Sequence, residues 1–85
     1  GVYAIPRAFY NGKERKLDKK KDVKVTYEGD PIPLKSEDFE LEYSSSDITT
    51  VGEITVRARG IQGKYKDITT GQGANYFITK YSCFS

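Results

Sequence analysis

The chain has 85 residues, which is enough for one small domain. Charged residues make up 31% of it, but the formal net charge is only +2, and this balance argues against a basic protein that neutralises phosphates. No apolar run approaches the roughly 20 residues of a membrane-spanning helix, so we expect no membrane contact. Because the chain has no histidine and one cysteine, the usual nucleophile–base pairs cannot form, and we expect neither an enzyme nor a bound cofactor.

The single cysteine, Cys83, cannot form a disulfide within the chain, which excludes the disulfide frameworks of small secreted domains. A half-buried or frayed thiol is the plain interpretation, and an interchain link or a reactive thiol is the alternative. Because the sequence begins with Gly1 and shows no signal peptide, we expect residues 1–85 to form one domain of a longer, multidomain polypeptide.

The first third of the chain predicts short strands and a charged loop. Residues 2–10 are apolar with weak alternation, and Pro6 predicts an edge strand or a strand broken at this residue. Asn-Gly at 11–12 predicts a tight turn. Residues 13–22 hold six basic and three acidic residues around the lone apolar Leu17, which favours an irregular loop over a helix. In the next segment Val23, Val25 and Tyr27 alternate on one face, which predicts a strand.

The remainder predicts further strands joined by polar, glycine-rich turns. Glu28-Gly29 is a turn signal, and the prolines at 31 and 33 exclude a helix. Residues 39–43 and 53–58 alternate cleanly, as half-buried strands do. The inward side chains are Phe39, Leu41 and Tyr43 in the first and Ile54, Val56 and Ala58 in the second. Tyr65 and Ile68 are the expected plugs of the next loop, and the last strand turns either Tyr76 and Ile78 or Phe77, Thr79 and Tyr81 inward.

Five or six short strands, turn signals about every ten residues and no convincing helix predict an all-β domain. The most natural arrangement is a small antiparallel β-sandwich with one face of each sheet in water. Gly52 and Gly60 bracket one strand where the chain must turn sharply. Tyr43 ends a strand beside a loop, where a tyrosine hydroxyl can bond to the backbone as corner tyrosines do in sandwiches.

The order of these landmarks resembles an immunoglobulin-like repeat of bacterial surface and secreted proteins. The repeat reads roughly V-x-V-x-Y-x-G-x-x-L, then D-[YF]-x-[LV]-x-Y-S, a short polar loop, V-G-x-[AI]-T-V-x-x-x-G, and G-x-Y, after a lead-in strand that ends in YxGK. This chain matches it across roughly residues 5 to 80 at Val23, Val25, Tyr27, Gly29, Leu34, Asp38, Phe39, Leu41, Tyr43, Ser44, Val51, Gly52, Ile54, Thr55, Val56, Gly60, Gly63 and Tyr65.

The resemblance implies an immunoglobulin-like β-sandwich of about six or seven strands, strung between neighbouring domains of an extracellular or cell-surface protein. Its implied role is that of a non-enzymatic structural spacer. Two alternatives stay open. One is an adhesion module that binds cell-wall or host glycans, or another polyanion, through loops 13–22, 44–52 and 66–75. The other is an immunoglobulin-like decoration domain of a phage particle.

The candidate contacts for a polyanion are the six cations of the first loop, although the acidic residues among them weaken the pattern and make nucleic acid an unlikely partner. They are Lys13, Arg15, Lys16, Lys19, Lys20 and Lys21. Glu40 and Glu42 share a strand face and suggest an acid–base pair, or a calcium site with Asp38 or Asp47, but a solvated strand face explains them as well. We expect no metal site. A Lys80–Asn75 crosslink would need buried groups, and both residues look exposed.

Overall fold

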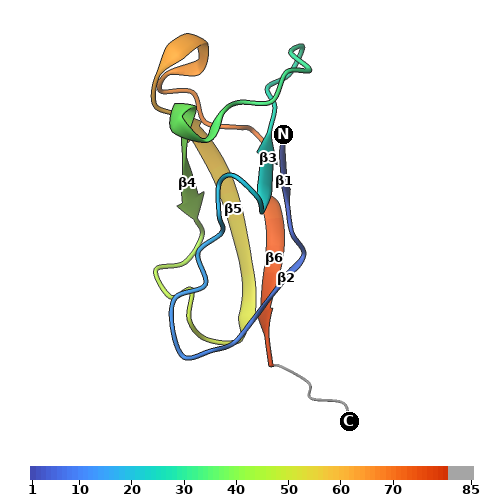
Figure 1. Cartoon of the computed structure of the whole chain (residues 1–85), viewed down its shortest axis with the longest axis vertical. Coiled ribbons are helices and arrows are strands. Elements are labelled where there is room, and N and C mark those ends of the chain that lie inside the picture. The colour runs from blue at the N-terminus through green and yellow to red at the C-terminus, as the bar shows by residue number, and fades with distance from the viewer. Residues whose placement is uncertain (81–85) are drawn as a thin grey trace.

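The computed structural model describes residues 1–80, which form six strands in two sheets (Figure 1). The elements in chain order are β1 (Val2–Ala4), β2 (Arg7–Phe9), β3 (Val23–Val25), the 3-10 turn η1 (Ser36–Asp38), β4 (Phe39–Tyr43), β5 (Gly52–Gly60), the 3-10 turn η2 (Gly63–Tyr65) and β6 (Ala74–Thr79). The all-β prediction is confirmed, because these residues contain no helix longer than three residues. No helix among them is long and apolar enough to cross a membrane.

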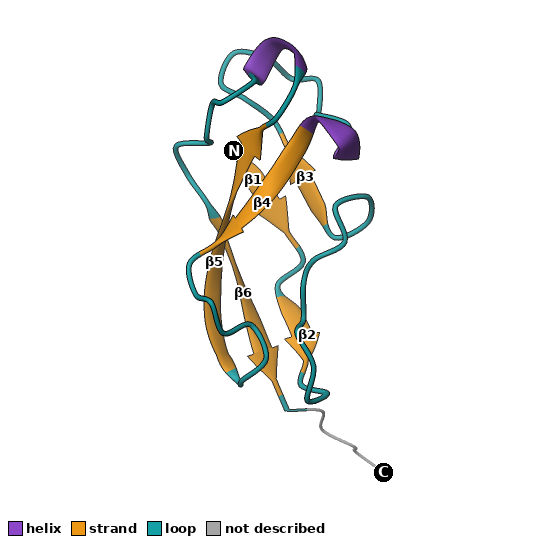
Figure 2. Cartoon of the chain, turned by 90° about the vertical axis from the view of Figure 1, so that its left-hand side faces the viewer, coloured by secondary structure: helices purple, strands orange, loops and turns teal. Residues whose placement is uncertain are grey.

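The larger sheet has the strand order β2-β6-β5-β4, and the smaller sheet pairs β1 with β3. The molecule is elongated, with extents of 47 × 25 × 20 Å. In Figure 1 the N-terminus lies in the upper half, and β6 ends at the lower end. Figure 2 shows both 3-10 turns at the upper end. We call the end that carries the two 3-10 turns the upper end, and the end at which β6 stops the lower end.

Pro6 separates β1 from β2 and moves the chain from one sheet to the other, so the predicted break is confirmed. Before Pro6, β1 pairs antiparallel with β3, with Tyr3 opposite Lys24. After it, β2 pairs with β6 in parallel, with Ala8 opposite Ile78. The prediction of a purely antiparallel domain is therefore wrong at this edge. A proline without an N–H suits the point where a strand leaves one ladder and joins another.

Buried side chains form two hydrophobic clusters, each with residues from both sheets, and they follow the alternation of the strands. Phe39 is 1% exposed, and Ile54, Val56 and Ala58 are also buried, as their spacing predicts. The open question about the last strand is settled by β6, which turns Tyr76 and Ile78 inward.

Of the two side chains expected to plug the loop after β5, Tyr65 and Ile68, only the first does so. Tyr65 is half-buried and stacks on Tyr27, with ring centroids 4.1 Å apart, so it plugs the loop as expected. Ile68 does not, because its backbone is held by bonds to Gly60 and Tyr65 while its side chain stays exposed. Cys83 and Tyr81, about which expectations were stated, lie outside the described residues.

Candidate functional site

The basic loop, residues 13–22, runs lengthwise along one flank instead of gathering its cations at one point. It starts after the turn at Gly12, which has a φ of 80°, near the lower end, and it climbs to the start of β3 (Figure 1). The prediction of an irregular loop is confirmed. Because the loop is drawn out along the molecule, its six cations do not form a single cluster.

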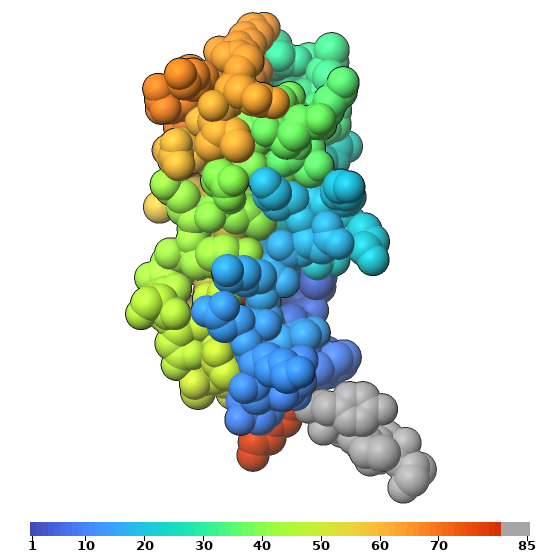
Figure 3. Space-filling model, turned by 60° about the vertical axis from the view of Figure 1, so that its left-hand side comes forward, coloured from blue at the N-terminus to red at the C-terminus, as the bar shows by residue number. Residues whose placement is uncertain are grey.

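The middle of the loop closes the open edge of β4, and Figure 3 shows the two segments packed together. Leu17 is buried in the core, and its N–H donates to the Tyr43 hydroxyl at 3.0 Å. This bond is the tyrosine–backbone contact that the sequence predicts. Lys19 donates from Nζ to Phe39 O at 2.9 Å and lies 3.9 Å from Glu40 Oε1. Lys19 therefore serves the fold and is not a free contact for a ligand.

Of two more of the predicted cations, Arg15 is held through its backbone and Lys16 lies near an acidic neighbour. The backbone of Arg15 donates to Ile48 O at 2.9 Å and accepts from the Tyr76 hydroxyl at 3.1 Å, so this residue joins the loop to the core. Its side-chain Nε is buried and has no hydrogen-bond partner among residues 1–80. Lys16 lies 3.9 Å from Glu14, and both side chains are well exposed.

Among the described residues, the remaining three cations, Lys13, Lys20 and Lys21, are exposed and form no ion pair. Lys20 and Lys21 lead directly into β3, on which Lys24 points outward opposite the exposed ring of Tyr3. Neither Lys24 nor Tyr3 is among the six residues predicted as polyanion contacts from the sequence. Alternation along residues 23–27 already predicted that Lys24 faces the solvent. Its proximity to Tyr3 comes from the pairing of β1 with β3 and could not be predicted from alternation.

The acidic residues do not converge on a common centre. Glu40 and Glu42 share the outer face of β4, but Glu40 faces Lys19, whereas Glu42 lies 3.3 Å from Arg59 Nε. Asp38 accepts a hydrogen bond from Gln62. In residues 1–80, no group of three acidic or cysteine side chains is placed to hold a metal ion.

Asp47 is occupied by its own loop. Its carboxylate accepts the backbone N–H groups of Thr49 and Thr50 and the Thr50 hydroxyl. These bonds, led by the one from Thr49, lower the pKa of Asp47. Lys80 and Asn75 are both exposed, as expected from the sequence, and Asn75 bonds to Thr55. The crosslink alternative therefore lacks the buried groups that it requires.

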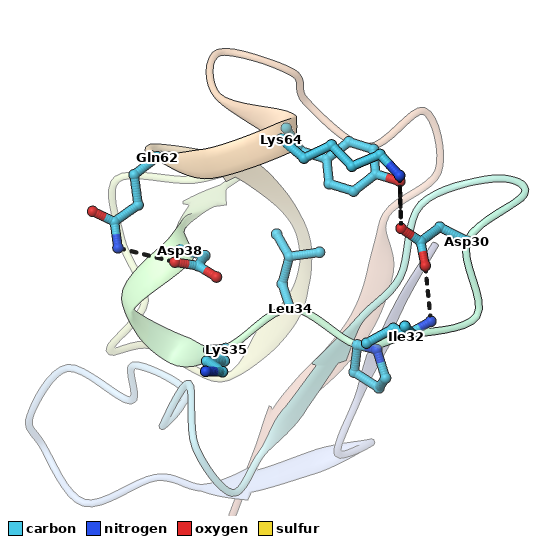
Figure 4. Close-up of a pocket in the computed structure, with 9 residues that line it drawn as sticks. Asp30, Ile32, Leu34, Lys35, Asp38, Gln62 and Lys64 are labelled. Carbon is cyan, nitrogen blue, oxygen red and sulfur yellow. Dashed lines mark hydrogen bonds and ion pairs between the residues drawn. The ribbon is translucent and has the colours of Figure 1, made fainter.

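A cavity of about 240 Å³ opens at the upper end, between η1, η2 and the loop that follows β3 (Figure 4). We call it the upper-end cavity. Leu34 points into its centre, and polar side chains surround it. No pattern in the sequence predicts this site, because its parts lie on three separate segments of the chain. The lining residues are Asp30, Ile32, Pro33, Leu34, Lys35, Asp38, Gln62, Lys64 and Tyr65.

One wall of the cavity is a fixed hydrogen-bond network. The Tyr65 hydroxyl donates to Asp30 Oδ2 at 2.8 Å, and Lys64 Nζ lies 3.4 Å from the same oxygen. These groups, with the bond from Tyr65 the largest contribution, lower the pKa of Asp30. The same bond raises the pKa of Tyr65. The Asp30 carboxylate thus already accepts hydrogen bonds, and the Tyr65 phenol stays protonated. The arrangement therefore suits packing and binding better than proton transfer.

Comparison of the chain with models of protein families, with curated proteins and with solved structures finds no match. The resemblance to a bacterial immunoglobulin-like repeat accordingly stays a prediction.

Proposed function

We propose that the chain is an immunoglobulin-like β-sandwich module that acts as a non-enzymatic, load-bearing spacer in a bacterial cell-surface or secreted protein. Two sheets that contribute to both hydrophobic clusters, and an axis of 47 Å against 25 and 20 Å, support this proposal. A spacer needs a long, stable body and no reactive centre, and several of the polar groups described above, among them Lys19, Asp30 and Asp47, bond within the fold.

The pairing of β2 with β6 is the observation that carries the proposal. The two strands run in the same direction, and backbone bonds join Phe77 N to Pro6 O at 2.9 Å and Tyr10 N to Thr79 O at 2.7 Å. Tension that draws the N-terminal side upward and the end of β6 downward moves these strands along each other. Bonds loaded in this shearing direction share the force, whereas bonds in a hairpin that is peeled open break one after another.

Force spectroscopy on the full chain, held at Gly1 and Lys80, tests the proposal. Because Pro6 and Tyr10 turn their backbone groups toward β6, the alternation of β2 places Ala8 toward β6 and Arg7 toward the open edge. Ala8→Pro should therefore lower the unfolding force clearly, while Arg7→Pro should leave it near the wild-type value. Equal unfolding forces for the three folded proteins would remove the basis for a load-bearing role.

A second candidate function, weak binding of an anionic glycan, is favoured by the exposed surface around Lys24. This residue, Lys20 and Lys21 carry no ion pair in the described residues, and the exposed ring of Tyr3 offers an apolar face for a sugar. The neighbouring Asp22 is engaged, since it accepts the N–H of Asp18 at 2.8 Å. Lysines beside an aromatic ring can attract and orient a sugar chain that carries phosphate or sulfate.

An NMR titration with cell-wall polysaccharide, and with heparin as a second polyanion, tests this candidate. Saturable shifts confined to Tyr3 and residues 20–24, which weaken as salt is added, are the expected result. Lys24→Gln should reduce the affinity, and Lys16→Gln, outside this surface, is the matched control. The absence of shifts at millimolar ligand would reject the candidate and leave the spacer proposal untouched.

A further inference from the structure

The chain carries four side-chain amides, and their neighbours in sequence set their reactivity. Asn11, Gln62 and Gln72 are each followed by glycine, whereas Asn75 is followed by Tyr76. Because glycine has no Cβ, its backbone nitrogen is unhindered and can approach the amide carbon of the preceding side chain. An asparagine then closes a five-membered ring, whereas a glutamine must close a six-membered ring, which forms far less readily. Asn11 is therefore the amide best placed for this reaction.

The turn at Asn11 leaves both reacting groups accessible. The Asn11 side chain is exposed, and the turn lies after β2, near the lower end (Figure 1). Gly12 has a φ of 80°, and nothing beyond its chain neighbours lies within 4 Å of the place that a Cβ would take. Its N–H donates no hydrogen bond to any of residues 1–80. The Gly12 nitrogen can therefore move toward Asn11 without breaking a bond of the fold.

A backbone donor already holds the amide oxygen of Asn11. The N–H of Lys13 donates to Asn11 Oδ1 at 2.9 Å. Attack of the Gly12 nitrogen on Asn11 Cγ places negative charge on this oxygen, and a donor that already points at such an oxygen lowers the barrier. The turn thus supplies an unhindered nucleophile and a donor for the developing charge.

Asn75 has the opposite environment and serves as an internal comparison. Its Oδ1 accepts from the Thr55 hydroxyl at 2.8 Å, and its Nδ2 donates to Glu53 Oε2 at 3.0 Å, so both ends of the amide are held. The residue lies within β6, where the next residue, Tyr76, is paired with Ile54 of β5 and is fully buried. Ring closure at Asn75 would displace the backbone of a central strand.

We propose that Asn11 is a site of spontaneous modification, at which the folded protein converts asparagine into aspartate and isoaspartate. The Gly12 nitrogen forms a bond to Asn11 Cγ, the bond from Cγ to Nδ2 breaks, and Nδ2 leaves as ammonia with the proton from Gly12. Water then opens the cyclic imide at either of its carbonyl groups. The reaction consumes one water and releases one ammonia, so it needs no oxidant and no further reactant. The inference does not depend on the spacer proposal.

The two products change the turn in different ways. Aspartate keeps an oxygen that accepts the Lys13 N–H, and it lowers the formal net charge by one, from +2 to +1. Isoaspartate makes the same change in charge and also adds a methylene group to the main chain. This longer backbone directly follows Tyr10, whose N–H bonds to Thr79 O. We therefore expect shifted NMR signals for the amides of Tyr10 and Lys13 in the modified protein.

Incubation of the full chain at mildly alkaline pH, followed by peptide mass mapping and an enzymatic assay for isoaspartate, tests the proposal. Asn11 should gain about one dalton at a rate at least about tenfold above that of the other three amides. Asn11→Gln keeps the amide, the glycine and the charge but enlarges the ring, and it should abolish the conversion at this position. Asn75→Ser is the matched control and should leave the rate at Asn11 unchanged.

A parallel incubation in guanidinium chloride separates the fold from the local sequence. Asn11 should react at a similar rate in the folded and the unfolded chain, whereas Asn75 should react measurably only in the unfolded chain. Three results would overturn the proposal: an Asn11 that reacts in guanidinium chloride but stays intact in the folded protein, equal rates at Asn11 and Asn75 in the folded protein, or an Asn11→Gln variant that reacts as fast as the wild type.

Discussion

Gly60 lies where two backbone segments come too close for any side chain. A Cβ at this position would sit 1.9 Å from Tyr65 O, and because this atom belongs to the backbone it cannot rotate away. We expect Gly60→Ala to destabilise the domain by about 2–4 kcal/mol, measured by urea unfolding. Gly52→Ala is the matched control, since a Cβ there meets nothing within 4 Å, and it should be neutral or slightly stabilising.

Tyr76 is fully buried, and the loss of hydration raises the pKa of its hydroxyl from 10.0 to about 12. The fold therefore favours the protonated phenol, and this contribution to stability is complete below pH 10 and is lost as the pH rises toward 12. The shift of two pKa units corresponds to about 3 kcal/mol. Alkaline unfolding followed by circular dichroism should show this loss.

The variant Tyr76→Phe separates this residue from the other tyrosines. It should cost about 1 kcal/mol at pH 7, because the hydrogen bond to Arg15 O is lost, and then lose less stability than the wild type between pH 10 and 12. Tyr3→Phe, at an exposed hydroxyl, should follow the wild-type curve. If Tyr76→Phe and the wild type fall in parallel above pH 10, burial of this hydroxyl is not the cause.

At the residue scale, the sequence predicted what depends on neighbours along one strand. The inward faces of Phe39 and Ile54 follow from period-two alternation alone, whereas alternation left two possible faces for β6 and only the structure shows that Tyr76 is buried. Contacts between distant loops did not follow, because no local pattern encodes them. Tyr65 meets Asp30 across 35 positions of sequence, and Ile68 turns outward because bonds from its neighbours fix the backbone.

The element that carries the most unexpected role is the basic loop, which is part of the core instead of a solvated tip. Leu17 is 6% exposed, and the loop is joined to β4 through the bonds of Leu17 and Lys19. We expect Leu17→Ala to destabilise the domain by about 2–4 kcal/mol in thermal unfolding. Lys16→Ala, one position away with an exposed side chain, should change stability by about 0.5 kcal/mol or less.

At the same scale, the sequence predicted where strands lie better than which strands pair. The turns at Gly12 and Gly29 follow from their residues, and both glycines have a φ of 80°. The parallel β2–β6 pair joins the two ends of the chain, and nothing near Ala8 or Ile78 in sequence indicates it. The upper-end cavity could not be predicted for the same reason, because it exists only where η1, η2 and the loop after β3 come together in the folded chain.

The whole molecule is an elongated body in which β2, near the start of the chain, pairs with the last strand, β6, so its resistance to force should depend on direction. Tension between Gly1 and Lys80 shears β2 against β6. Tension between Val51 and Lys80 acts on the same lower end of the antiparallel strands β5 and β6 and peels them apart from Gly52 and Ile78 inward. We expect the second geometry to unfold the domain at a clearly lower force, measured on one Cys83→Ser background with attachment points moved between experiments. A domain whose unfolding force is the same in both directions resists through its core alone, and the parallel strand pair would then have no mechanical role.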